Sequence, residues 1–113
     1  MLLFLSSIFG KIVETDKADR HFDFAIDTGD KLYLMEVNYY GAGGSKLKSV
    51  AGEFSNLFNL VKNDTTGFIW VTDGLGWHTA NRPLRETFNV TDHVMNINMI
   101  EQGLLEEILV KRL

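Results

Sequence analysis

A β-hairpin is predicted by residues 21–40, which read HFDFAIDTGDKLYLMEVNYY. From residue 21 to residue 27 apolar side chains recur at every second position, which is the period of a half-buried strand. A second strand is expected over residues 31–40, after a turn at residues 27–30 in which Gly29 can adopt a positive φ. The two faces of the first strand are expected to carry Phe22, Phe24 and Ile26 on one side, and His21, Asp23 and Ala25 on the other.

Two acidic side chains come together on this hairpin if its turn is centred on residues 28–29. Asp23 then lies opposite Leu34, and Glu36 follows further along the same face. Diagonal neighbours of this kind have Cα atoms roughly 7–8 Å apart, which lets two carboxylates reach one ion. Asn38 shares the face, because alternate residues of an extended strand point the same way.

A solvated role is the alternative for Asp23, since isolated carboxylates on strands are common. Glu36 is harder to explain in that way, because it interrupts the apolar run of residues 32–37, where a charge without a partner is costly. Carboxylate oxygens, completed by water and a substrate phosphate, are the ligands that Mg²⁺ typically uses in phosphoryl-transfer sites. The pattern by itself is common, but the position of Glu36 favours a functional role, and Asp23 and Glu36 are the candidate ligands of a metal, with Mg²⁺ as cofactor and Mn²⁺ as its substitute.

Helices and strands alternate along the rest of the chain. The expected elements are a helix over residues 45–62 with Ser45 as its N-cap, a buried strand over 67–72, a helix over 80–88, a strand over 94–97, and a final helix over 98–113 with Asn98 and Glu101 as a capping box. A helix between two strands predicts a crossover with parallel pairing. The fold class is therefore α/β, a mixed β-sheet flanked by helices.

Composition argues against several classes of site. The 113 residues contain no cysteine, which excludes disulfides and thiolate metal sites and is compatible with a reducing cytoplasm. His21, His78 and His93 show no close ligand spacing, so we interpret them as structural or surface residues rather than as a zinc site. Residues 1–9 are apolar but too short to span a bilayer, so they are expected in the core or as an exposed remnant, and no membrane partner is predicted.

The start of the 45–62 helix is a candidate phosphate-binding position. Residues 43–46 read GGSK, which lacks the Walker pattern and argues against a phosphate-loop NTPase. The backbone N–H groups there, with Ser45, Lys46 and Lys48, can receive a DNA phosphate, although solvated lysines are the alternative. The net charge of −4 argues mildly against a broad DNA-binding surface and leaves room for a local basic patch.

Several segments, in the same order, resemble the C-terminal half of the DpnII/MboI family of type II restriction endonucleases. These segments are HFDF at residues 21–24, LMEVNYY at 34–40, GGSKL at 43–47, IWVTDGLGW at 69–77, LRETF at 84–88 and NIN at 96–98. The similarity covers most of residues 20–98, and the combined order of the motifs makes it more specific than any single motif.

The resemblance implies a PD-(D/E)xK core that hydrolyses both strands of double-stranded DNA at unmethylated GATC sites, with Mg²⁺. By this resemblance Asp23 is the first acidic residue, Glu36 is the second, and Asn38 stands where lysine is usual. Either Asn38 acts as an orienting group, or Lys46 supplies a positive charge from the following helix. A homodimer is expected, because cutting both strands of a symmetric site favours two-fold symmetry.

Full members of this family are more than twice as long and carry a substantial N-terminal region. We expect one nuclease-like domain over residues 1–113, and truncation at its N-terminus relative to the family is left open. One alternative function is a catalytically inactive nuclease-like remnant that acts as a binding or assembly module. Another is a nuclease of the same fold that recognises the structure of branched DNA rather than a base sequence.

Overall fold

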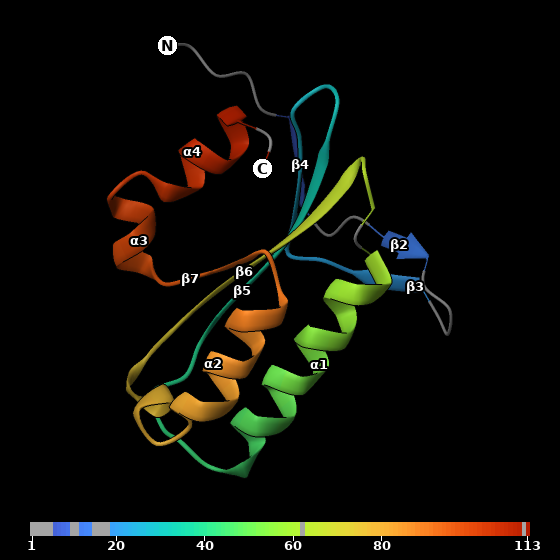
Figure 1. Cartoon of the computed structure of the whole chain (residues 1–113). Helices are drawn as coiled ribbons and strands as arrows, with labels where there is room; N and C mark the ends of the chain where they lie inside the picture. Colours follow the sequence, from blue (N-terminus) through green and yellow to red (C-terminus); the bar gives the residue numbers. More distant parts are fainter. Residues whose placement is uncertain (1–5, 10–11, 15–18, 62, 112) are drawn as a thin grey trace.

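The fold is a mixed β-sheet covered by helices on both faces (Figure 1). The computed structural model describes residues 6–9, 12–14, 19–61, 63–111 and 113. The five-stranded sheet has the order β1-β4-β5-β6-β7, with β1 at Ser6–Phe9, β4 at Phe24–Asp27, β5 at Leu32–Tyr39, β6 at Thr66–Asp73 and β7 at His93–Met95. The predicted fold class is confirmed.

The pairing of β5 with β6 is parallel, as the sequence predicts, and β6 with β7 is parallel too, whereas β4 pairs with β1 and β5 in antiparallel fashion. A separate two-stranded sheet joins β2 (Ile12–Glu14) to β3 (Asp19–His21). Of the apolar N-terminal segment, residues 6–9 form the edge strand β1, and residues 1–5 lie outside the described residues.

The core consists of two clusters, one between the sheet and α1 and the other between the sheet and α4. The helical elements are α1 at Ser45–Val61, the 3₁₀ helix η1 at Leu75–His78, α2 at Asn81–Val90, α3 at Ile97–Glu101 and α4 at Leu104–Lys111. Figure 1 shows α1 and α2 together on one side of the sheet, with α3 and α4 on the other. Accordingly, Leu34 and Trp70 pack with α1 residues in one cluster, while Tyr33 and Ile69 pack with α4 residues in the second.

The hairpin register differs from the prediction. Ala25 pairs with Leu34, so residues 28–31 form the loop, and the turn is not centred on residues 28–29. The Asp27 carboxylate accepts a hydrogen bond from the N–H of Gly29, whose φ is 103°. This local bond favours the loop of residues 28–31 over a two-residue turn at residues 28–29. Continuing the register beyond β4 brings Asp23 opposite Glu36 instead of Leu34. The faces are unchanged, because only a shift by an odd number of residues exchanges them.

The predicted strand over residues 21–27 is interrupted. Since β3 ends at His21 and β4 begins at Phe24, residues 22–23 belong to neither strand. As a result Phe22 packs in the cluster under α1, whereas Phe24 and Ile26 pack in the cluster on the α4 side. The prediction that Phe22 shares a face with Phe24 and Ile26 is therefore wrong, because the chain bends between the two strands and the alternation is lost.

Three predictions about the helices are also corrected. Ser45 is the first residue of α1 rather than its N-cap, and Gly44, with φ of 132°, precedes it. The final helix is divided into α3 and α4 at Gly103, whose φ is 94°. Its N-cap is Asn96, whose side chain accepts a hydrogen bond from the N–H of Met99, so the predicted capping box at Asn98 and Glu101 is wrong. None of the described helices is long and apolar enough to cross a membrane.

Glycines let two loops pack backbone to backbone at the carboxyl ends of β5 and β6. A Cβ on Gly74, whose φ is 116°, would lie 2.1 Å from the carbonyl oxygen of Tyr40, and a Cβ on Gly76 would lie 2.5 Å from that of Ala42. Tyr40 donates its N–H to the Asp73 carbonyl oxygen, and its own carbonyl accepts the N–H of Gly76, both at 2.9 Å. The chain that follows β5 is thereby fixed in place.

Candidate active site

Asp23 lies at the amino end of β4 and binds the neighbouring strand. Its Oδ2 accepts a hydrogen bond from the backbone N–H of Val37 at 2.9 Å. The β4–β5 ladder ends at the pair of Phe24 and Met35, so the Asp23 carboxylate satisfies a strand N–H just beyond the last pair. Among the described residues, none forms a hydrogen bond or an ion pair with the second oxygen, Oδ1.

Glu36 is the buried carboxylate of the site. It lies in β5 between β4 and β6, its relative exposure is 8%, and its register partner in β6 is Trp70. Because Asp23 binds Val37, the next residue of β5, the two acidic residues occupy neighbouring positions on adjacent strands. The sequence predicted two carboxylates at this place. Their role as metal ligands stays a prediction.

Asn38 is held by a tryptophan. The indole Nε1 of Trp70 donates to Oδ1 of Asn38 at 3.0 Å, and Trp70 is 0% exposed. An indole N–H can only donate, so the atom that faces it must be the amide oxygen of Asn38. Trp70 lies in the segment predicted as a buried strand, but the sequence gave no sign of this contact, which depends on the side chains of two paired strands.

Tyr40 and Glu53 are two further polar residues near the carboxylates, and both were missed. Burial raises the pKa of the Tyr40 phenol above its ordinary value, and the negative charges of Glu53 and of Glu36 raise it further. A carboxylate of β5, Glu36, and one of α1, Glu53, therefore both act on the Tyr40 phenol. A positional signal was available in the sequence. From Glu36 to the end of β5 the strand rises about 10 Å, and from its first residue to Glu53 the antiparallel helix α1 rises about 12 Å, so Glu53 returns to the level of Glu36.

Ser45, Lys46 and Lys48, the predicted DNA-binding residues, are exposed on the first turn of α1. Within the described part of the chain, Lys46 makes no contact with Asp23 or Glu36. The helix starts beyond the carboxyl end of β5, whereas Glu36 lies inside that strand. The alternative in which Lys46 supplies the positive charge from the helix therefore gains no support from the described contacts.

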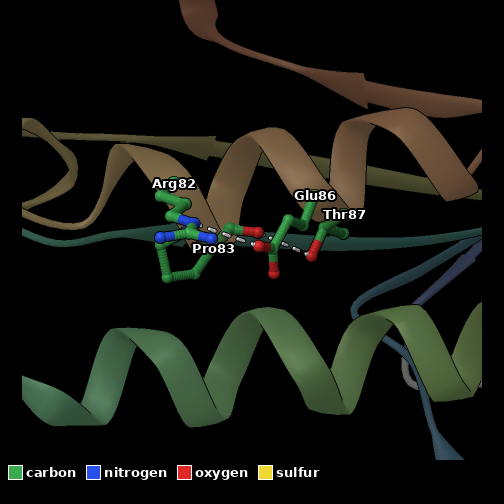
Figure 2. A network of polar contacts seen from close by, with 4 residues as sticks. All are labelled: Arg82, Pro83, Glu86 and Thr87. Carbon is green, nitrogen blue, oxygen red and sulfur yellow. Dashed lines mark hydrogen bonds and ion pairs between the residues drawn. The ribbon is translucent and has the colours of Figure 1, made fainter.

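A groove of about 300 Å³ is lined by residues of α1 and α2, which are joined directly by the hydrogen bond that Thr87 Oγ1 donates to the Ala51 carbonyl oxygen at 2.9 Å. Lys48 and Glu86 line it from opposite sides. Figure 2 shows Arg82 and Glu86 paired along α2, with a nitrogen–oxygen distance of 3.5 Å, and Thr87 bonded to the Pro83 carbonyl at 3.2 Å. The Arg82–Glu86 pair is exposed to solvent, so it contributes little to stability.

The donor set fits a hard cation that keeps most of its own water. No group of three or more His, Cys, Asp or Glu side chains in the described ranges is placed to hold a metal ion. Asp23 and Glu36 would supply two oxygen ligands, and water or substrate oxygens would complete the shell, as is usual for Mg²⁺. His78 is exposed, and His93 contacts the Leu113 carbonyl oxygen at 3.0 Å, so neither joins the carboxylates.

Comparison with known proteins gives one family. The family model described as DpnII restriction endonuclease matches residues 3–107. The type II restriction enzyme MjaIII of Methanocaldococcus jannaschii is 51% identical over 98 residues, which cover 83% of this chain and 34% of the relative. LlaDCHI of Lactococcus lactis subsp. cremoris is 44% identical over 97% of this chain and 38% of its own length. MboI of Moraxella bovis is 35% identical over 91% of this chain and 37% of its own length.

The chain thus spans between 34% and 38% of the length of these three curated relatives. A solved structure, that of the protein of unknown function AF1548, superposes with a TM-score of 0.55 at 11% sequence identity. It covers 81% of this chain and 49% of the other, and at this identity it shows a shared fold alone.

Proposed function

Because the chain belongs to the DpnII family of restriction endonucleases, we propose that it is the metal-dependent catalytic part of an enzyme that hydrolyses phosphodiester bonds in DNA. One observation carries the proposal: Asp23, anchored on the N–H of Val37, lies beside the buried Glu36 at the junction of two strands. Such a pair of oxygen donors on rigid strands suits a divalent cation.

A bound Mg²⁺ would supply Lewis-acid polarisation of the scissile phosphate and lower the pKa of a coordinated water. Asp23 would hold the cation through Oδ1, since its Oδ2 is engaged with the backbone of β5. Glu36 would hold it from inside the sheet, where burial limits movement of the carboxylate and reduces screening by solvent. The exposed first turn of α1, with Ser45, Lys46 and Lys48, would contact DNA phosphates.

The target that we propose is an unmethylated GATC site in double-stranded DNA. Two copies of the catalytic chain would act on the two strands, since a symmetric site is matched by a symmetric dimer. For the chain by itself both the target and the dimer are part of the proposal, because it covers only 34% to 38% of the three compared relatives.

The test is cleavage of plasmid DNA with Mg²⁺, using unmethylated and adenine-methylated GATC sites and a plasmid without GATC. The wild-type chain should cut only the unmethylated GATC plasmid, while Asp23→Ala and Glu36→Ala should cut none. Asp27→Asn is the matched control, because Asp27 also accepts a backbone N–H but at the far end of β4. Equal cleavage by all four proteins would contradict the assignment of the site.

A catalytically inactive binding module is the second candidate, and it is favoured by Asn38 at a position where the family resemblance expects lysine and by the net charge of −4. In that case the residues that recognise DNA bases would be supplied by another part of the protein or by a partner. Calorimetric titration with Mg²⁺ or Mn²⁺ separates the two functions. Binding that is abolished by Glu36→Ala supports the nuclease, and absence of metal binding in the wild type supports the module.

A further inference from the structure

The buried indoles of Trp70 and Trp77 are neighbours, and each donates one hydrogen bond. Trp70 donates its Nε1–H to Oδ1 of Asn38 at 3.0 Å, and Trp77 donates its Nε1–H to Oγ1 of Thr72 at 2.9 Å. The two rings meet edge to face, with centroids 5.7 Å apart at 78°. Each bond satisfies a buried donor that would be costly to leave unpaired, so stability alone accounts for both. The acceptors differ in what remains of their hydrogen-bonding capacity.

Asn38 keeps two donors after its oxygen is used. Since the oxygen of the amide must face the indole, the Nδ2 group points away from Trp70, and its orientation is fixed by a side chain that is 0% exposed. Among the described residues, nothing accepts a hydrogen bond from Nδ2. Asn38 is only half buried and lies two residues from Glu36 on the same face of β5, so its Nδ2 group is on the side of the sheet that carries this candidate metal ligand.

We propose that Trp70 is a positioning residue that locks the Asn38 amide, so that Nδ2 donates to an oxygen of the scissile DNA phosphate. The inference rests on the proposed nuclease function and adds a role that neither burial nor the carboxylate pair implies. A locked neutral amide recognises a phosphate oxygen by direction rather than by charge, and it requires no reorientation when the substrate binds. Asn38 would thus be a catalytic residue, and Trp70 would act through it.

The two tryptophans give a matched pair of variants. Trp70→Phe and Trp77→Phe each remove one buried indole N–H and shrink one ring, so both should lower the midpoint of thermal unfolding. Only Trp70→Phe should lower kcat. The expected loss is about tenfold, which corresponds to losing one hydrogen bond to a charged group in the transition state. KM and the Mg²⁺ affinity should change by less than about twofold, because the carboxylates and the first turn of α1, which we propose as the phosphate contact, are untouched.

A double-mutant comparison separates positioning from packing. In an Asn38→Lys background the side chain no longer offers an acceptor to Trp70, so a further Trp70→Phe change should leave kcat within about twofold. A tenfold loss in that background would mean that Trp70 acts through packing, and it would overturn the proposal. Equal kcat for wild type and Trp70→Phe would overturn it as well, while leaving the nuclease function intact.

Nuclear magnetic resonance gives a readout that does not depend on turnover. With Ca²⁺ and a short GATC duplex, the side-chain amide signals of Asn38 should shift on titration, and Trp70→Phe should abolish that shift while Trp77→Phe keeps it. Amide signals that stay unchanged while the duplex binds would overturn the inference alone. A wild-type chain that binds neither metal nor duplex would overturn the proposed function, and the inference with it.

Discussion

Asp23 and Val37 are joined by a hydrogen bond of 2.9 Å from the backbone N–H of Val37 to Oδ2 of Asp23. The bond fixes a carboxylate at the point where β4 stops pairing with β5, next to Glu36. One oxygen of Asp23 therefore has a structural role, and the other is the oxygen that we propose as a metal ligand. Substitutions can separate these two roles.

Asp23→Asn should keep the fold and lose the metal. An asparagine oxygen can still accept the N–H of Val37, so the free energy of unfolding should stay within about 0.5 kcal/mol of wild type. Asp23→Ala should lower the free energy of unfolding by about 1 kcal/mol more than Asp23→Asn does, because the hydrogen-bond acceptor is removed. Urea denaturation measures stability, and calorimetry should show that both variants lose Mg²⁺ binding. Wild-type metal affinity in Asp23→Asn would contradict the assignment of Asp23 as a ligand.

Gly74→Ala should be strongly destabilising. Its φ of 116° disfavours any side chain, and a Cβ would lie 2.1 Å from the Tyr40 carbonyl oxygen, which belongs to the backbone and cannot move aside. We expect a loss of at least about 2 kcal/mol in the free energy of unfolding. Gly52→Ala is the matched control, since a Cβ there meets nothing within 4 Å and α1 should gain about 1 kcal/mol. Urea denaturation of both variants measures the contrast, and equal stabilities would show that the two loops are not in close contact.

The sequence predicted those parts of the fold in which one local pattern suffices. The helical period of residues 45–62 and the apolar run of residues 67–72 led to α1, β6 and the parallel pairing. The carboxylate pair was also predicted despite a wrong turn centre, because the register error was even and kept Asp23 and Glu36 on neighbouring positions.

The errors arose where tertiary contacts overrode a local pattern. Asn96 and Asn98 have equally good side chains for an N-cap, and only the position at which β7 ends selects Asn96. The bond between Trp70 and Asn38 depends on which residues of two strands come into register, far apart in the sequence. Neither choice is encoded in spacing or composition, so a single sequence read by periodicity could not reveal them.

The Tyr40 phenol should make stability fall at alkaline pH. Burial, and then the charges of Glu53 and Glu36, raise its pKa above the ordinary 10.0, so the folded state binds the phenolic proton more tightly than the unfolded state. The resulting stability is fully present below pH 10.0 and is lost as the pH rises through the raised pKa. Urea denaturation on either side of that pH should show the loss in wild type.

Tyr40→Phe should remove this part of the alkaline loss, because no phenol remains to ionise at that position. The neighbouring Tyr39 is 66% exposed, and Tyr39→Phe should leave the loss as large as in wild type. Glu53→Gln should move the loss to a lower pH, since one of the negative charges that raise the pKa is removed. Identical pH profiles for all the proteins would show that the phenol at position 40 is not held near these carboxylates.

Lys46→Ala should weaken DNA binding through phosphate contacts. If the exposed first turn of α1 meets the DNA backbone, removing one cation should lower the slope of log affinity against log salt concentration by about 1. Lys48→Ala should act in the same way. Lys111→Ala is the control, because Lys111 ends α4 and pairs with Glu107 at 2.8 Å. Fluorescence anisotropy with a labelled duplex at several salt concentrations measures the slope.

The two lysine variants should weaken binding equally for duplexes with and without GATC, since phosphate contacts position a protein on DNA but carry no base information. A loss confined to the GATC duplex would instead assign the start of α1 to base recognition. An unchanged slope in both variants would remove α1 from the DNA interface, and the cations that bind the backbone would then have to be sought on another face of this acidic chain, whose net charge is −4.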